Sequence, residues 1–172
     1  MNFSIVKIMR RLFAPQHELS CSRRLWKKLL SALRERGHNG ERESGAFLLG
    51  HRQGSRARIT EFVLYDDLDP KCLDAGIVRF DGRYFGTLWD ICKQRRVSVV
   101  ADVHTHPAGS QQSDSDRANP MISRPGHVAL ILPRFGAAPV RRGEVGMYRY
   151  NGSKQWSPVP AKKRTEYFHL GF

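Results

Sequence analysis

The sequence predicts a single domain of the α+β class, layered in the α/β manner, with a mixed β-sheet flanked by helices. Its 172 residues suit one domain with a buried core, and 40% of them are hydrophobic. Two runs, at 97–103 and 128–132, are almost continuously apolar, which is typical of strands covered on both faces. Amphipathic helical patterns at 22–36 and 81–95 supply the covering layers.

Two amphipathic helices are predicted in the N-terminal part of the chain. The first follows a helical stripe formed by Ile5, Ile8, Met9, Leu12 and Phe13. The second spans 22–36, where Ser20 or Ser22 can cap the first turn and Gly37 stands where helices commonly end. Its apolar face consists of Leu25, Trp26, Leu29, Leu30 and Leu33.

The middle of the chain alternates between short apolar runs and one further helix. Strands are predicted at 45–50, 57–64 and 76–80. Asp81 is the expected N-cap of a helix that reaches residue 95. The polar segment 107–126 separates the two buried strands, and segments of this length are usually functional or disordered. A last strand is predicted at 144–150.

The formal charge of +13 is concentrated at the two ends of the chain. Residues 1–37 hold nine basic and two acidic side chains, and residues 141–172 hold seven and two, so the middle is nearly neutral. We therefore expect a basic extension at 1–19, the domain itself at 20–157 and a basic tail at 158–172. These flanks are predicted to dock an acidic partner protein or an anionic membrane, and nucleic acid is the less favoured partner.

Cysteine usage and hydropathy indicate a cytoplasmic protein. Cys21, Cys72 and Cys92 are an odd number at wide spacing without a CxxC pair, so neither a disulfide framework nor a zinc ribbon is expected. Charged side chains interrupt the apolar stretch 3–13, which excludes it as a membrane span or a secretion signal.

The segment with the clearest chemistry is the end of the buried strand, where His104-Thr105-His106-Pro107 follows. Side chains alternate along a strand, so His104 and His106 point to the same face and can hold one metal ion. Asp116 lies within reach on the polar segment and would complete a His₂Asp set, leaving a fourth position open as in catalytic zinc sites. A pair of partly exposed imidazoles without metal is the alternative interpretation.

Three further ionisable residues carry weaker signals. Glu43 precedes an apolar strand without an obvious charge partner, and it is either an exposed acid at a strand end or the general base that activates water. Asp102 shares a face with His104, so it either orients that ligand or is simply a buried, hydrogen-bonded acid. His127 begins a core strand and is interpreted as a polar neighbour of the core.

Taken together, these pieces resemble the signature of the JAMM (MPN, Mov34, JAB) zinc metalloproteases. The matching residues are Glu43 with Gly45-Ala46-Phe47-Leu48-Leu49-Gly50, then His104-Thr105-His106-Pro107, then Ser113 and Asp116. They occur in the family's order, and the resemblance extends over about residues 20–150. The loop between Pro107 and Ser113 is one residue shorter than in the usual pattern. Asp114 is the competing choice of ligand, but its frame would require a serine where Gln111 stands.

The resemblance implies a fold and a set of roles. The fold would be the mixed sheet of JAB/MPN domains. His104, His106 and Asp116 would bind Zn²⁺, Glu43 would act as base and then as acid toward the leaving amine, and Ser113 would help to hold the oxyanion. The short loop resembles small bacterial members of the family, such as the JAB peptidases of CBASS antiphage operons.

The resemblance also implies a substrate class and partners. Members of this family hydrolyse the peptide or isopeptide bond after the C-terminus of ubiquitin or a ubiquitin-like protein, in deconjugation or precursor processing, and bacterial forms act beside E1- and E2-like proteins. Two alternatives remain: an inactive MPN scaffold, which usually lacks one of the four site residues, and a DNA-associated JAB-like protein.

Overall fold

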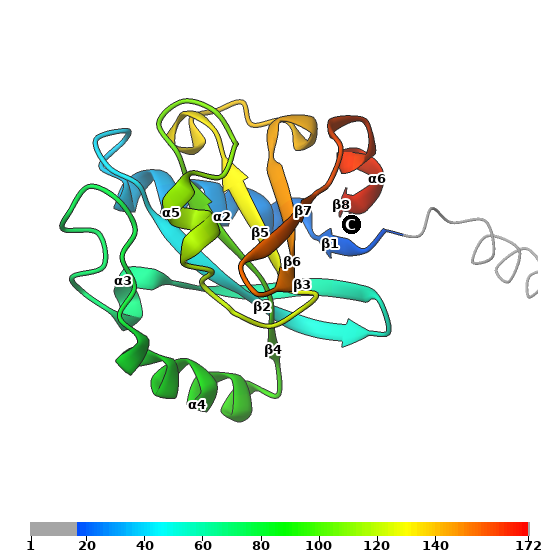
Figure 1. Ribbon diagram of the computed structural model, residues 1–172, viewed down its shortest axis with the longest axis horizontal. Helices are drawn as coiled ribbons and strands as arrows, with labels where there is room; N and C mark the ends of the chain where they lie inside the picture. The colour runs from blue at the N-terminus through cyan, green and yellow to red at the C-terminus, as the bar shows by residue number, and fades with distance from the viewer. Residues whose placement is uncertain (1–16, 172) are drawn as a thin grey trace, which may run out of the picture.

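The protein forms a curled mixed sheet with flanking helices, which confirms the predicted fold class (Figure 1). The computed structural model describes residues 17–171, and within them the strand order is β7-β6-β5-β4-β2-β3-β1-β8. β4 runs parallel to β5 and antiparallel to β2, so the sheet is mixed at its centre. The strands are β1 (Leu19–Cys21), β2 (Gly45–Gln53), β3 (Arg56–Leu64), β4 (Ser98–Thr105), β5 (Val128–Leu132), β6 (Gly146–Gly152), β7 (Gln155–Pro158) and β8 (Phe168–Leu170).

Two long helices have the predicted positions and caps. In α2 (Arg23–Arg36) the Ser22 hydroxyl accepts from the Leu25 amide at 3.1 Å, which satisfies one of the free donors of the first turn. The helix predicted after Asp81 begins as a 3₁₀ turn, η1 (Gly82–Tyr84), and continues as α4 (Phe85–Arg95). The shorter elements are α3 (Tyr65–Leu68), α5 (Asp114–Ala118), α6 (Arg164–Tyr167), η2 (Arg134–Gly136), η3 (Arg142–Glu144) and η4 (Ala161–Lys163).

The sheet separates two apolar cores. Ala46 and Leu48 of β2 pack with the buried face of α2, because alternate side chains of a strand point to opposite faces. Phe47 and Leu49 pack on the other face, in the cluster that includes residues of α3 and α4. The continuous burial of β2 from Gly45 to Gly50 therefore follows from its place in the middle of the sheet (Figure 1).

The prediction of a strand at 76–80 is wrong, because these residues have no regular secondary structure. The apolar side chains of Val78 and Phe80 instead pack onto the core from a loop. The amide of Arg79 donates to the carbonyl of Cys72 at 2.8 Å, so the segment folds back on the preceding turns and does not pair with the sheet.

The C-terminal residues are part of the sheet. β8 lies parallel to β1, and the ring of Phe168 is fully buried at 5.0 Å from that of Trp26. The sheet thus continues beyond residue 158, and the predicted boundary at residue 19 falls at the first residue of β1. The predicted helix over 5–13 lies outside the described residues. No helix within 17–171 is long and apolar enough to cross a membrane.

Candidate metal centre

The two histidines lie at the carboxyl end of the central strand β4. The strand extends through Thr105, so His104 is held by ladder bonds to β2 and β5 on either side. His106 follows directly, and its amide donates to the Leu132 carbonyl at 2.9 Å. The Nε2 atoms of the two rings lie 3.0 Å apart, and each side chain is about nine-tenths buried. His104 and His106 therefore point to the same side, as predicted.

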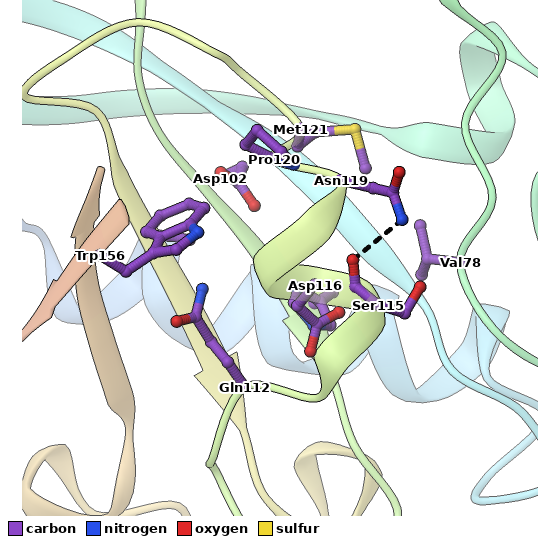
Figure 2. Close-up of a pocket in the computed structure, with 11 residues that line it drawn as sticks. Val78, Asp102, Gln112, Ser115, Asp116, Asn119, Pro120, Met121 and Trp156 are labelled. Carbon is purple, nitrogen blue, oxygen red and sulfur yellow. Dashed lines mark hydrogen bonds and ion pairs between the residues drawn. The ribbon is translucent and has the colours of Figure 1, made fainter. Parts of the chain in front are cut away.

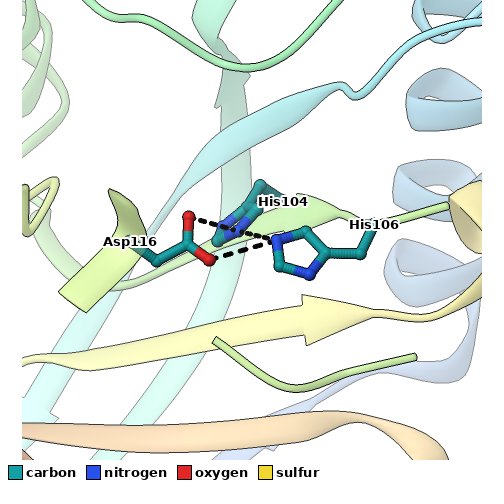
Figure 3. A group of neighbouring side chains, drawn as sticks. All are labelled: His104, His106 and Asp116. Carbon is teal, nitrogen blue, oxygen red and sulfur yellow. Dashed lines mark hydrogen bonds and ion pairs between the residues drawn. The ribbon is translucent and has the colours of Figure 1, made fainter. Parts of the chain in front are cut away.

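Asp116 reaches the same point from the short helix α5 (Figure 3). Its Oδ1 lies 3.3 Å from Nε2 of His104, and its Oδ2 lies 3.2 Å from Nε2 of His106. Ser113 forms a capping box with Asp116: the Ser113 amide donates to Oδ2 at 2.7 Å, and the Ser113 hydroxyl accepts from the Asp116 amide at 3.1 Å. The competing carboxylate, Asp114, is 96% exposed and pairs with Arg117, so the structure brings only Asp116 to the histidines.

Glu43 approaches the group from the loop before β2. Its Oε1 lies 4.0 Å from Nε2 of His106, and its side chain is 15% exposed. The loop after α3 holds it, because its amide donates to the Gly76 carbonyl at 2.9 Å and its Oε2 accepts from the Val78 amide at 3.3 Å. Glu43 is thus an anchored carboxylate beside the histidines. It is not the exposed acid at a strand end that the alternative interpretation described.

The ionisable side chains of the group shift one another's pKa values. Burial alone would raise the pKa of Asp116, but hydrogen bonds from His104 and His106 outweigh it and place the pKa well below its ordinary value. Burial alone would lower the pKa of His104, and the hydrogen bond to Asp116 outweighs it in the same way and raises that pKa. Asp116 is therefore an anion held against two imidazoles.

The geometry of the three side chains fits a metal ion. One ligand atom from each of His104, His106 and Asp116 can be chosen so that all lie within 4.8 Å of one another. Ligands on a tetrahedral ion with bonds of about 2.0–2.1 Å are separated by about 3.3 Å. The two Nε2 atoms, 3.0 Å apart, are close to that separation, and Asp116 approaches each of them within 3.2–3.3 Å, through Oδ1 to His104 and through Oδ2 to His106. The group supplies three ligands, the number of protein ligands in catalytic zinc sites.

A small cavity of about 60 Å³ opens beside His104 and Asp116 (Figure 2). Asp102 lies in the wall of this cavity. Its Oδ1 lies 2.5 Å from Nε2 of His127, and its Oδ2 accepts from the Tyr65 hydroxyl at 3.1 Å. Of the two interpretations offered for Asp102, the buried, hydrogen-bonded acid is the one that the contacts support.

Sequence reasoning missed three residues that shape the site. Val78 anchors Glu43, Trp156 of β7 lines the cavity, and Tyr65 holds Asp102. Tyr65 follows β3 directly and could have been read as the end of that strand's apolar run. No pattern in the sequence connects Val78 or Trp156 with the histidines, because both come from distant segments.

Comparisons with known proteins support the fold, and one of them points to metalloprotease chemistry. No model of a known protein family matches the chain. A protein of Sinorhizobium fredii named "Probable metalloprotease y4jG" is 24% identical over 132 residues, which cover 77% of this chain and 79% of that protein. The solution structure of protein DSY2949 from Desulfitobacterium hafniense has the same fold, with a TM-score of 0.63 at 15% identity over 88% of this chain and 92% of that one. The chain is thus a distant homologue of a protein named a probable metalloprotease, and it carries its own His-His-Asp group that could hold a metal ion.

Proposed function

We propose that this protein is a zinc-dependent peptidase of the JAMM (MPN, JAB) class, which hydrolyses the bond after the C-terminus of a ubiquitin-like modifier. The observation that carries the proposal is the convergence of four side chains, Glu43, His104, His106 and Asp116, from three separate parts of the chain. Two imidazoles and a carboxylate are a donor set that zinc accepts in hydrolytic enzymes. The similarity to a protein named a metalloprotease points to the same chemistry.

The roles of the residues follow from their positions. His104, His106 and Asp116 would hold the ion, which when bound polarises the scissile carbonyl and acidifies a water molecule. Glu43 has one oxygen anchored by the Val78 amide, and the other, Oε1, faces His106. That free oxygen is placed to take a proton from the attacking water and to return it to the leaving amine.

Ser113 has a hydroxyl that already accepts one hydrogen bond. It accepts from the Asp116 amide, so its own O–H remains available as a donor. A donor at this position, next to a metal ligand, can stabilise the negative oxygen that develops on the substrate carbonyl. We assign Ser113 this role and no nucleophilic one, because both nearby imidazoles belong to the metal group.

A cysteine mechanism does not fit the chain. Cys21, Cys72 and Cys92 are all buried free thiols. Burial raises the pKa of Cys21 and Cys72 to about 12, so neither forms the thiolate that a nucleophile requires. The peptidase chemistry is accordingly assigned to the metal group.

The cavity beside the metal group is where we propose that the end of the modifier tail lies. The cavity of about 60 Å³ is lined by His104, Asp116 and Trp156, so it lies directly beside the metal group. An extended tail that ends in glycine would lie across it and bring its last carbonyl to the metal group. Isopeptide deconjugation and precursor processing both meet this description.

The partners that we propose are an acidic protein and, through it, an E1- or E2-like conjugation system of the bacterial antiphage kind. The first two turns of α2 carry four exposed cations, Arg23, Arg24, Lys27 and Lys28. None of the four has an ion pair within residues 17–171. Cations near a helix N-terminus interact unfavourably with the helix dipole. An acidic partner surface would offset this unfavourable interaction.

Cleavage of a defined substrate tests this function. Zinc-loaded protein is incubated with ubiquitin-like proteins that carry a C-terminal peptide extension, and the products are identified by mass spectrometry. We expect a single cut after the terminal glycine, abolished by a chelator and restored by zinc. Zinc binding without cleavage of any modifier fusion or peptide would support the inactive scaffold, and cleavage of unrelated peptides alone would contradict the modifier specificity.

A further inference from the structure

The helix that carries Asp116 is not held by the core. None of the residues of α5 is buried, and the helix lies in the long polar segment between β4 and β5. The capping box between Ser113 and Asp116 fixes the first turn only locally. The position of Asp116 relative to His104 and His106 therefore depends on contacts from other parts of the chain.

Trp156 of β7 provides one such contact (Figure 2). Its indole Nε1 donates to the carbonyl of Arg117 at 3.2 Å. This carbonyl belongs to the last turn of α5, where the helix has no amide left to donate to it. The indole ring itself is fixed by an edge-to-face contact with Tyr150 of β6, with centroids 4.9 Å apart.

Tyr148 of β6 holds the other end of the same segment. Its hydroxyl donates to the carbonyl of Ser110 at 2.8 Å, three residues before the capping serine. β6 approaches this carbonyl closely at Gly146, where a Cβ atom would stand 2.0 Å from the oxygen. The segment that carries Asp116 is thus fastened before α5 by β6 and at the end of α5 by β7.

We propose that the β6–β7 hairpin, through Trp156 and Tyr148, positions Asp116 for metal binding. The inference rests on the proposed metal site and adds two positioning residues that touch neither the metal ligands' donor atoms nor the reacting atoms. His104 and His106 stand on the ladder of β4 and need no such support. Asp116 does need such support. When either bond is removed, metal binding must also order α5, and the observed affinity for the metal falls.

Two substitutions remove the bonds and keep the rings. In Trp156→Phe the aromatic wall of the cavity and most of the contact with Tyr150 remain, and only the indole donor is lost; Tyr148→Phe likewise loses only a hydroxyl. The control is Trp89→Phe, on the outer face of α4, where the side chain is 47% exposed and stacks on Phe85. Zinc affinity is measured by competition with a chromophoric chelator.

We expect each of Trp156→Phe and Tyr148→Phe to weaken zinc binding about 10-fold, the lower end of the range for residues that orient metal ligands, with no change in Trp89→Phe. In metal-free protein, amide exchange over 108–118 should accelerate in both variants while exchange in β2 and β4 stays slow. Saturating zinc should restore turnover in Trp156→Phe, whereas Asp116→Asn stays inactive.

Two results would overturn the inference. One is wild-type affinity together with wild-type exchange over 108–118. The other is an equal acceleration of exchange across the whole sheet, which would mean that the two residues act on general stability. A wild-type protein that binds no zinc would instead contradict the proposed function, and the exchange measurement would still decide whether the hairpin holds α5.

Discussion

The hydroxyl of Thr105 accepts a hydrogen bond from the backbone amide of Ser44 at 2.9 Å, in a fully buried environment. Thr105 stands between the two histidines and points to the opposite face of β4, while Ser44 follows Glu43. The Ser44 hydroxyl in turn donates to the Leu33 carbonyl at 2.7 Å. The strand that carries the metal ligands is thus tied to the residue beside the proposed base, and both are tied to α2.

Removal of the Thr105 hydroxyl should affect the function of Glu43 as a base more than it affects metal binding. We expect Thr105→Val to lower the free energy of unfolding by about 1–3 kcal/mol, because a buried amide loses its partner. Turnover should fall more than zinc affinity, since Ser44 adjoins Glu43. The control is Thr60→Val on an exposed position of β3, and equal effects on zinc affinity and turnover would argue against the coupling.

The two neighbouring carboxylates provide a matched pair for the metal site. Asp116→Asn should reduce zinc binding at least 10-fold, because the pKa of Asp116 lies far below its ordinary value and the anion is lost in the variant. Asp114→Asn should bind zinc as the wild type does, since Asp114 is exposed and pairs with Arg117. Isothermal titration calorimetry with zinc measures both, and the reverse order would show that the ligand has been misassigned.

Gly45, at the start of β2, packs closely against Tyr65 and β4 and has no space for a side chain. A Cβ atom at Gly45 would lie 2.2 Å from the ring of Tyr65 and 2.9 Å from the Val103 carbonyl. We expect Gly45→Ala to destabilise the fold by about 1–3 kcal/mol through overpacking. Gly86→Ala, in α4 where a Cβ meets nothing within 4 Å, should instead be neutral or stabilise by up to about 1 kcal/mol. Urea unfolding of the two variants checks the contrast.

The buried thiols predict how stability depends on pH. Burial raises the pKa of Cys21 and Cys72 from an ordinary value of 9.0 to about 12. Between these values the folded protein keeps protons that the unfolded chain releases, so the stabilisation is complete below pH 9 and is lost as the pH rises toward 12. Urea unfolding at pH 8 and pH 10 should show this loss, and Cys72→Ala should reduce it. Rapid reaction of native protein with a thiol reagent at pH 8 would contradict the burial.

Local patterns predicted much of the fold and the core of the site. The Ser22 cap of α2, the Asp81 cap of the η1 turn that leads into α4, the buried strands β4 and β5, and the shared face of His104 and His106 all follow from short-range sequence patterns. The choice of Asp116 over Asp114 came from a motif frame, and the structure brings Asp116 to the histidines because the capping box turns it inward.

Long-range pairing is what the sequence did not reveal. β1 and β8 are three residues each and pair with one another from opposite ends of the chain, so neither has an apolar run of its own. The run at 76–80 failed as a strand because its apolar residues pack from a loop that follows α3. The same loop supplies the Val78 amide to Glu43, a contact between backbone and side chain that leaves no pattern in the sequence.

The most direct test of the account is the substitution Glu43→Gln, assayed for zinc content and for cleavage of a ubiquitin-like fusion in the same preparation. Glutamine can still accept from the Val78 amide, but it cannot take up a proton. We predict about one zinc per chain, as in the wild type, and turnover reduced about 10²- to 10⁴-fold, the range for loss of a general base. A Glu43→Gln protein that keeps both its zinc and its wild-type turnover would contradict the proposed mechanism.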